Sequence, residues 1–199
     1  MQSKLHRITI NAMLAALFVG LSYLALDLYV IKFTFAPIAI ILAGFLFGPV
    51  DGFAVALVGA TLEQLLKYGV SVTLPLWVIP ALVRGLLVGL GARIFHRAMS
   101  ESSKKNAVYT ALITLVSSIV VTTLNTPVMY FDAWLFGYLE YTSIFGLALV
   151  WRYVSGIVCS VLYTVLTILI LTPVAHALRA RGKDVLWESG KKQMQMNGR

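Results

Sequence analysis

Apolar residues fill most of the chain in long blocks, and short polar segments separate these blocks. A helix that crosses a lipid bilayer needs about 20 predominantly apolar residues. The blocks predict six membrane spans, near residues 8–28, 34–50, 52–68, 76–96, 107–130 and 147–174. The second and third blocks are short and are joined by FGPVDG, so one broken segment is the alternative interpretation. The pattern therefore predicts an all-α integral membrane protein, a six-transmembrane-helix bundle.

Composition supports a membrane protein. The chain has 199 residues, of which 59% are hydrophobic and only 12% are charged, and its mean hydropathy is +0.87. An average soluble domain carries about 25% charged residues. We expect a single transmembrane domain over residues 1–178 and a basic tail at 179–199. The first apolar block continues without a small-residue cleavage site, which favours an uncleaved span over a cleaved signal peptide.

The basic residues predict how the bundle is oriented. With six spans and a cytosolic N-terminus, most lysines and arginines lie at the N-terminus, in or beside the 97–106 loop, or in the tail. They are Lys4, Arg7, Arg93, Arg97, Lys104, Lys105, Arg179, Arg181, Lys183, Lys191, Lys192 and Arg199. This is the positive-inside bias, so we expect both termini in the cytoplasm and a multi-pass protein of the cell membrane. The net charge of +8 is then explained by topology and contact with anionic lipid. Nucleic-acid binding is not expected.

A few polar side chains interrupt the expected spans, and all of them fall in the outward half. They are Glu63, Gln64, Arg84, Asn125 and Arg152. A charged residue at the centre of a span costs about 2.5–3.5 kcal/mol on insertion scales, so such residues usually face the bundle interior and serve a site or pathway. Their clustering at one depth is the strongest functional signal in the sequence.

The charges in this cluster leave two interpretations open. Glu63 and Arg84 could form a structural ion pair that ties the third and fourth spans together, but such a pair does not account for Arg152. Two arginines against one glutamate favour an anionic ligand that enters from outside. The guanidinium fork matches a carboxylate in a bidentate way.

Aromatic residues lie close to this cluster in the sequence. Trp77 and Pro80 share one helical face with Arg84, and the segment 125–146 is rich in aromatic residues. A belt at the headgroup level explains about half of them, and the others could cap a pocket against a flat ring. The candidate substrate-binding residues are Glu63, Gln64, Trp77, Arg84, Asn125, Tyr130, Trp134 and Arg152.

A stripe of small residues marks the first span. Ala12, Ala16 and Gly20 recur every four residues, and such a stripe lets another helix approach closely. The stripe could pack against another helix of this chain, or it could dock a separate membrane subunit.

The sequence carries no catalytic or nucleotide-binding motif. No pattern of a zinc protease, serine hydrolase or P-loop occurs, and the single cysteine, Cys159, gives no disulfide or cysteine metal site. We therefore expect no enzyme activity, no cofactor and no metal. A polytopic membrane enzyme, a stand-alone secondary transporter and a purely structural membrane subunit remain as rival classes.

One family shares the features described above. The six short spans, the stripe and the segment FAPIAIILAGFLFGPVDG resemble the substrate-binding S components of energy-coupling factor (ECF) vitamin transporters, over about residues 5–180. The recurring residues are Pro37, Ala43, Gly44, Phe47, Gly48, Pro49 and Gly52. The segments LWVIPALVRGLLVGLGA and VTTLNTPVMYFDAWLFGY look most like the folate-type group.

The resemblance implies a partner and a class of ligand. Such proteins bind a vitamin in a pocket that opens outward and then associate with an ECF module, made of a membrane scaffold subunit and two cytosolic ATPases. They are thought to topple in the membrane to deliver the vitamin. The stripe, at Ala12 and Ala16, would dock the scaffold. Folate, with a flat ring and carboxylates, is the expected ligand, and pantothenate is the runner-up. No role is predicted for Asp51 in FGPVDG.

Overall fold

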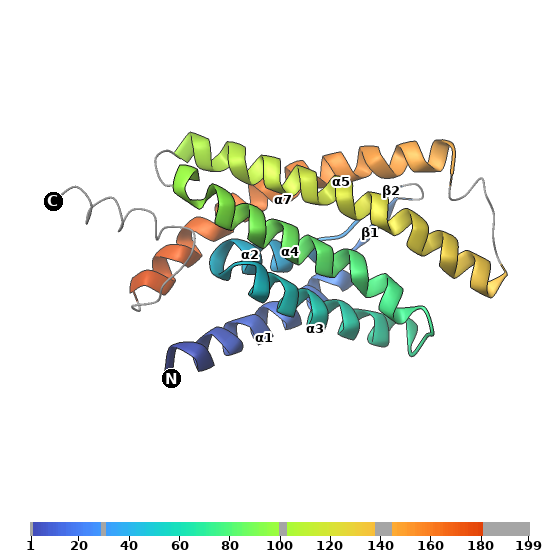
Figure 1. Cartoon of the computed structure of the whole chain (residues 1–199), viewed down its shortest axis with the longest axis horizontal. Coiled ribbons are helices and arrows are strands. Elements are labelled where there is room, and N and C mark those ends of the chain that lie inside the picture. The colour runs from blue at the N-terminus through green and yellow to red at the C-terminus, as the bar shows by residue number, and fades with distance from the viewer. Residues whose placement is uncertain (1, 29–30, 100–102, 138–144, 181–199) are drawn as a thin grey trace.

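Six helices and a short hairpin make up the described part of the chain, residues 2–28, 31–99, 103–137 and 145–180. The structure is a computed structural model. In chain order the elements are α1 (Gln2–Tyr23), β1 (Leu26–Leu28), β2 (Ile31–Phe33), α2 (Pro37–Phe47), α3 (Pro49–Tyr68), α4 (Leu74–Met99), α5 (Ser103–Phe136) and α7 (Leu147–Ala180). The long helices lie roughly along one axis (Figure 1), so the expected all-α bundle is confirmed.

Five of these helices, all except α2, are long and apolar enough to cross a membrane. Helix α2 has 11 residues, and every one of them is buried. At about 1.5 Å per residue it is roughly 16 Å long, about half of the hydrocarbon core of a bilayer. A helix that is apolar on all sides lies in a protein core or spans a membrane, and α2 is too short to span one. Helix α2 is therefore the centre of the bundle and contributes to both of its apolar clusters, around Phe45 and around Ile40.

The first helix ends earlier than the sequence pattern predicted. Helix α1 ends at Tyr23, and the chain then forms an antiparallel hairpin in which Leu26 pairs with Phe33 and Leu28 with Ile31. The expected span near 8–28 thus includes β1. Residues 26–28 and 31–33 each alternate apolar and polar positions, which is the period of a strand. Each run is only three residues long, so the apolar block that surrounds it hid the signal.

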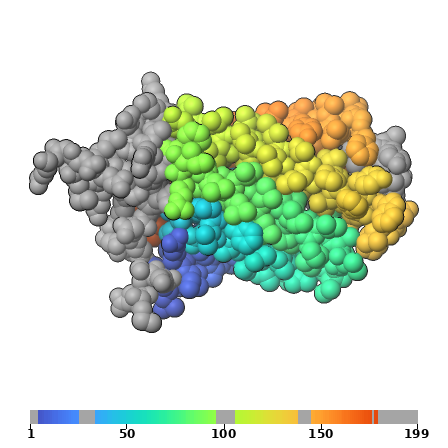
Figure 2. All heavy atoms as spheres, in the orientation of Figure 1, coloured from blue at the N-terminus to red at the C-terminus, as the bar shows by residue number. Residues whose placement is uncertain are grey.

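Glycines let α3 and α4 cross with their backbones in contact. A Cβ atom added at Gly52 would lie 2.6 Å from the carbonyl oxygen of Gly85, and one added at Gly85 would meet the backbone of Gly52. Small residues are the usual means by which membrane helices approach this closely. The crossing holds the backbone of α4 at Gly85, next to Arg84, against α3. On the face turned to the viewer in Figure 2, α4 (green) and α5 (yellow) lie side by side.

Candidate functional site

Two adjoining cavities lie between the helices, with volumes of about 380 and 200 Å³. Five residues line both cavities: Trp77, Arg84, Val121, Asn125 and Tyr163. The larger cavity is completed by residues of α5 and α7, and the smaller one by residues of α1, α2, α3 and α4. The volume of the larger cavity suits a small organic ligand, because such sites are typically about 300–1,000 Å³.

Helices α4, α5 and α7 each contribute one face to the walls of the larger cavity, and the α4 residues are Trp77 and Arg84. On α5 the lining residues are Ser118, Val121, Thr122, Asn125 and Met129. On α7 they are Arg152, Ser155, Gly156, Cys159 and Tyr163. Spacings of three, four and seven residues place side chains on one side of a helix. The walls are therefore a direct product of helical periodicity, and they combine hydroxyl groups with apolar surface.

Arg84 stands where the two cavities meet. Its guanidinium carbon lies 5.8 Å from the centre of the Tyr163 ring, and its Nε is buried without a hydrogen-bond partner among the described residues. A buried N–H group that lacks a partner costs free energy, and a bound ligand can supply the missing acceptor. Arg84 is therefore the side chain most clearly prepared for an anionic group.

Glu63 forms an ion pair with Lys67 and not with Arg84. Its Oε1 accepts a hydrogen bond from Lys67 Nζ at 2.9 Å, and Lys67 also donates to the backbone oxygen of Ser22 at 2.7 Å. No Glu63–Arg84 ion pair occurs between these two described side chains. Glu63 still lines the smaller cavity, so its carboxylate borders the site while its charge is balanced by Lys67.

Trp77 is held in place by an acidic residue of α5. Its indole Nε1 donates to Asp132 Oδ1 at 3.2 Å, and the Asp132 side chain is buried. The fifth expected span ended near residue 130, whereas α5 continues to Phe136 and includes Asp132. A tryptophan with its N–H bonded presents a fixed aromatic surface to both cavities.

Tyr163 belongs to the site but was missed by the sequence interpretation. Its hydroxyl donates to the backbone oxygen of Thr34 at 2.8 Å, which ties α7 to the chain just before α2. Within an apolar helix a tyrosine reads as one more hydrophobic residue. The signal that could have found it is its spacing of eleven residues from Arg152, which is three helical turns.

Three of the predicted residues lie away from the cavities. Gln64 is partly buried on α3 but lines neither cavity. Tyr130 packs against Phe131 and Phe145, with ring centres 6.0 and 6.3 Å apart. Trp134 is 63% exposed, as expected for a residue of an interfacial belt. The structure thus brings together Glu63, Trp77, Arg84, Asn125 and Arg152, but not these three.

The small-residue stripe faces away from the rest of the chain. Ala12, Ala16 and Gly20 are all exposed, and a Cβ atom added at Gly20 would meet nothing within 4 Å. The neighbouring Ala15 and Phe18 of α1 are buried. Packing of the stripe within the described part of the chain is therefore not observed.

The fold and the cavity define a membrane-embedded solute-binding protein. The family described as "ECF transporter, substrate-specific component" matches residues 6–174, and the chain belongs to this family. A solved structure of the S component of a bacterial ECF transporter has the same fold, with a TM-score of 0.60 and 22% identity, over 89% of this chain and 99% of that chain. No curated protein matches the chain.

Family membership fixes the general function. The protein is the substrate-binding S component of an ECF importer and a multi-pass protein of the cell membrane. It is a binding subunit of a transporter and not an enzyme, and its partners are a substrate and an ECF module. The expected class of protein is confirmed.

Proposed function

We propose that the two cavities bind an anionic, ring-bearing vitamin, with folate as the best candidate. The protein captures it outside the cell and delivers it inward when docked on the ATPase-driven ECF module. The observation that carries this proposal is the buried Arg84 guanidinium, whose Nε faces the cavities without a partner among the described residues.

The charge around the cavities favours an anion. Arg84 and Arg152 both line the larger cavity. Glu63 borders the smaller one, but Lys67 balances its charge. A carboxylate of the ligand would therefore be attracted to the arginine side of the site, where charge-assisted hydrogen bonds are short and strong.

The aromatic groups that line the same cavities favour a ligand that also carries a flat ring. The Trp77 indole is fixed by Asp132, and the Tyr163 ring is fixed by its bond to Thr34. Rigid aromatic surfaces bury a ring at little entropic cost and orient it by stacking. Folate combines such a ring with carboxylates, whereas pantothenate has one carboxylate and no ring.

The exposed stripe on α1 supports docking on the module. Ala12, Ala16 and Gly20 lie outside the bundle, where a helix of another subunit can approach closely. Alanine and glycine exposed on a membrane helix leave a shallow groove that lipid chains fill less well than a second helix does.

Isothermal titration calorimetry on the purified protein tests the ligand. We expect heat and tight binding with folate or a reduced folate, and weaker or no binding with pantothenate. Tight binding of pantothenate with no heat from folates would identify pantothenate as the ligand in place of folate. The argument that the site binds an anion would then still hold. Silence with every anionic vitamin would refute the proposal. Uptake by vesicles that contain this protein but lack the module would favour a stand-alone secondary transporter instead.

A further inference from the structure

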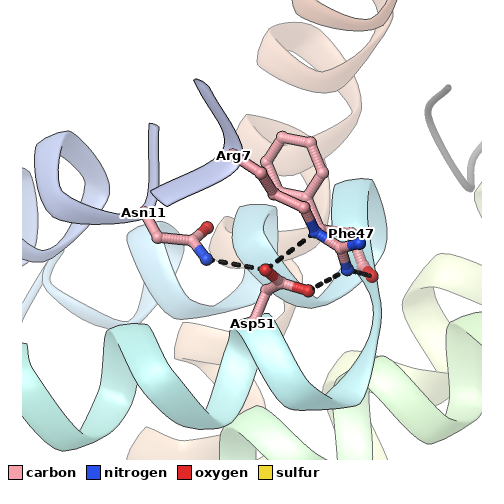
Figure 3. Close-up of polar contacts among 4 residues, drawn as sticks. All are labelled: Arg7, Asn11, Phe47 and Asp51. Carbon is pink, nitrogen blue, oxygen red and sulfur yellow. Dashed lines mark hydrogen bonds and ion pairs between the residues drawn. The ribbon is translucent and has the colours of Figure 1, made fainter. Parts of the chain in front are cut away.

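A buried carboxylate joins the beginning of α1 to the junction between α2 and α3 (Figure 3). Asp51 lies in the first turn of α3, and its side chain is only 8% exposed. It forms an ion pair with Arg7, whose Nε lies 3.0 Å from Asp51 Oδ1. Asn11 Nδ2 donates to the same oxygen at 2.6 Å. Two side chains one helical turn apart on α1 therefore bind one carboxylate.

The same arginine also contacts the end of α2. Arg7 Nη2 donates to the backbone oxygen of Phe47 at 2.8 Å, and the guanidinium carbon lies 5.7 Å from the centre of the Phe47 ring. Phe47 is the last residue of α2, where the final carbonyl groups of a helix lack partners within the helix. Arg7, Asn11, Phe47 and Asp51, here called the α1 clamp, thus connect three helices.

The α1 clamp fixes the rotation and the depth of α1. A buried carboxylate is costly unless its oxygens are bonded, so a placement of α1 in which Arg7 and Asn11 both bond to Asp51 is favoured. The first turn of α3 also favours a negative charge, because the positive end of the helix dipole lies there. At the other end of α1, Lys67 of α3 donates to the Ser22 carbonyl. Helix α1 is therefore attached to α3 at both ends.

This attachment decides which face of α1 points outward. Asn11 faces Asp51, and its neighbour Ala12 is turned by about 100° on the helix, which leaves it exposed. Ala16 and Gly20 follow on the same exposed face. A rotation of α1 by one residue would turn this stripe toward lipid at another angle and would remove Asn11 from the carboxylate.

We propose that Asp51, Arg7 and Asn11 are positioning residues for the ECF module: they hold α1 so that its exposed stripe is presented in the orientation that the module binds. This inference rests on the proposed docking through α1. None of the three residues lines either cavity. The α1 clamp therefore controls association with the module and leaves vitamin binding unchanged.

Affinity for the purified ECF module of the same organism, measured without vitamin on protein in nanodiscs, tests this. We expect Asp51→Asn and Arg7→Gln each to weaken module binding at least about tenfold. The double variant should be no more than about twofold weaker than the weaker of the two single variants, because both changes remove the same Arg7–Asp51 ion pair. Arg93→Gln is the matched control: it removes an exposed cation at the same end of the bundle and should leave module affinity unchanged.

Three results would overturn the inference: unchanged module affinity in Asp51→Asn, additive losses in the double variant, or equal losses of module and folate affinity. The last would mean that the α1 clamp only supports the fold. If Asp51→Asn does not fold, Arg7→Lys decides, since it keeps the charge but loses the planar fork and should bind the module measurably more weakly than Arg93→Lys. A wild-type protein that binds the module but not folate contradicts only the proposed vitamin. A wild-type protein that does not bind the module contradicts docking and the α1 clamp together.

Discussion

Replacement of Arg84 by alanine is the most direct test of the binding site. Arg84 forms no ion pair with Glu63, which pairs with Lys67, and its Nε has no partner among the described residues. Truncation therefore leaves no acid unpaired, and it removes a charge whose insertion costs about 2.5–3.5 kcal/mol. We expect Arg84→Ala to fold and insert normally and to unfold at the same or a higher temperature than the wild type.

The loss should appear in ligand affinity instead. A hydrogen bond to a charged group contributes about 1.5–3 kcal/mol, and about 1.4 kcal/mol corresponds to a factor of ten in the dissociation constant. One carboxylate held by Arg84 therefore predicts binding that is roughly 10- to 150-fold weaker. The affinity of Arg84→Lys for the ligand should lie between those of the wild type and Arg84→Ala, because an ammonium keeps the charge but cannot form the paired bonds of a guanidinium.

Calorimetry with two ligands isolates the contact between Arg84 and the carboxylate. The vitamin and an analogue whose carboxylates are converted to amides are titrated into wild type, Arg84→Ala and the exposed-site control Arg93→Ala. The analogue should bind wild type and Arg84→Ala with similar affinity, while the acid distinguishes them. Equal binding of the acid by wild type and Arg84→Ala would refute the ligand role of Arg84. A misfolded Arg84→Ala would show that the arginine is structural.

Three further changes test other parts of the molecule. Ala16→Trp should abolish ATP-driven uptake by cells that contain the module while vitamin affinity of the purified protein stays unchanged, since Ala16 is exposed; a fall in affinity would indicate internal packing. Vitamin binding should quench tryptophan emission. Trp77→Phe should remove this quenching and Trp134→Phe should not, because of these two residues only Trp77 lines the cavities. The reverse result would show that the ring of the vitamin binds near Trp134 instead. Gly52→Ala should lower the thermal unfolding midpoint by a destabilisation of about 1–3 kcal/mol, as its Cβ atom would lie 2.6 Å from the Gly85 oxygen; an unchanged midpoint would show that α3 and α4 separate easily.

The five long membrane helices and part of the candidate site could be predicted because they depend on local patterns. Long apolar blocks specify membrane helices, and the rare charged or amide side chains inside them indicate the candidate site, which is why Arg84, Arg152 and Asn125 were predicted. The hydroxyl groups of Ser118, Thr122 and Ser155 were missed because such residues are common in membrane helices and carry no charge.

Pairing between distant residues could not be predicted in the same way. Arg7 and Asp51 are 44 positions apart, and nothing local to either residue identifies the other. The Glu63–Lys67 pair is different, because a spacing of four residues on one helix is a known source of ion pairs. The interpretation that Glu63 pairs with Arg84 on the fourth span chose a distant partner, although Lys67 lies four residues away on the same helix.

The contacts at the two ends of α1 also bear on whether the chain crosses the membrane an odd or an even number of times. Arg7 near the start of α1 meets Asp51 near the start of α3, and the carbonyl of Ser22 near the end of α1 meets Lys67 near the end of α3. Two consecutive long helices that run in the same direction require the chain to return between them, and Figure 1 shows that the hairpin and α2 make this return. Within the described part of the chain, a count of long apolar helices alone gives five, an odd number that would put the two termini on opposite sides. With α2 included the number is even, which agrees with the basic residues at both ends of the chain.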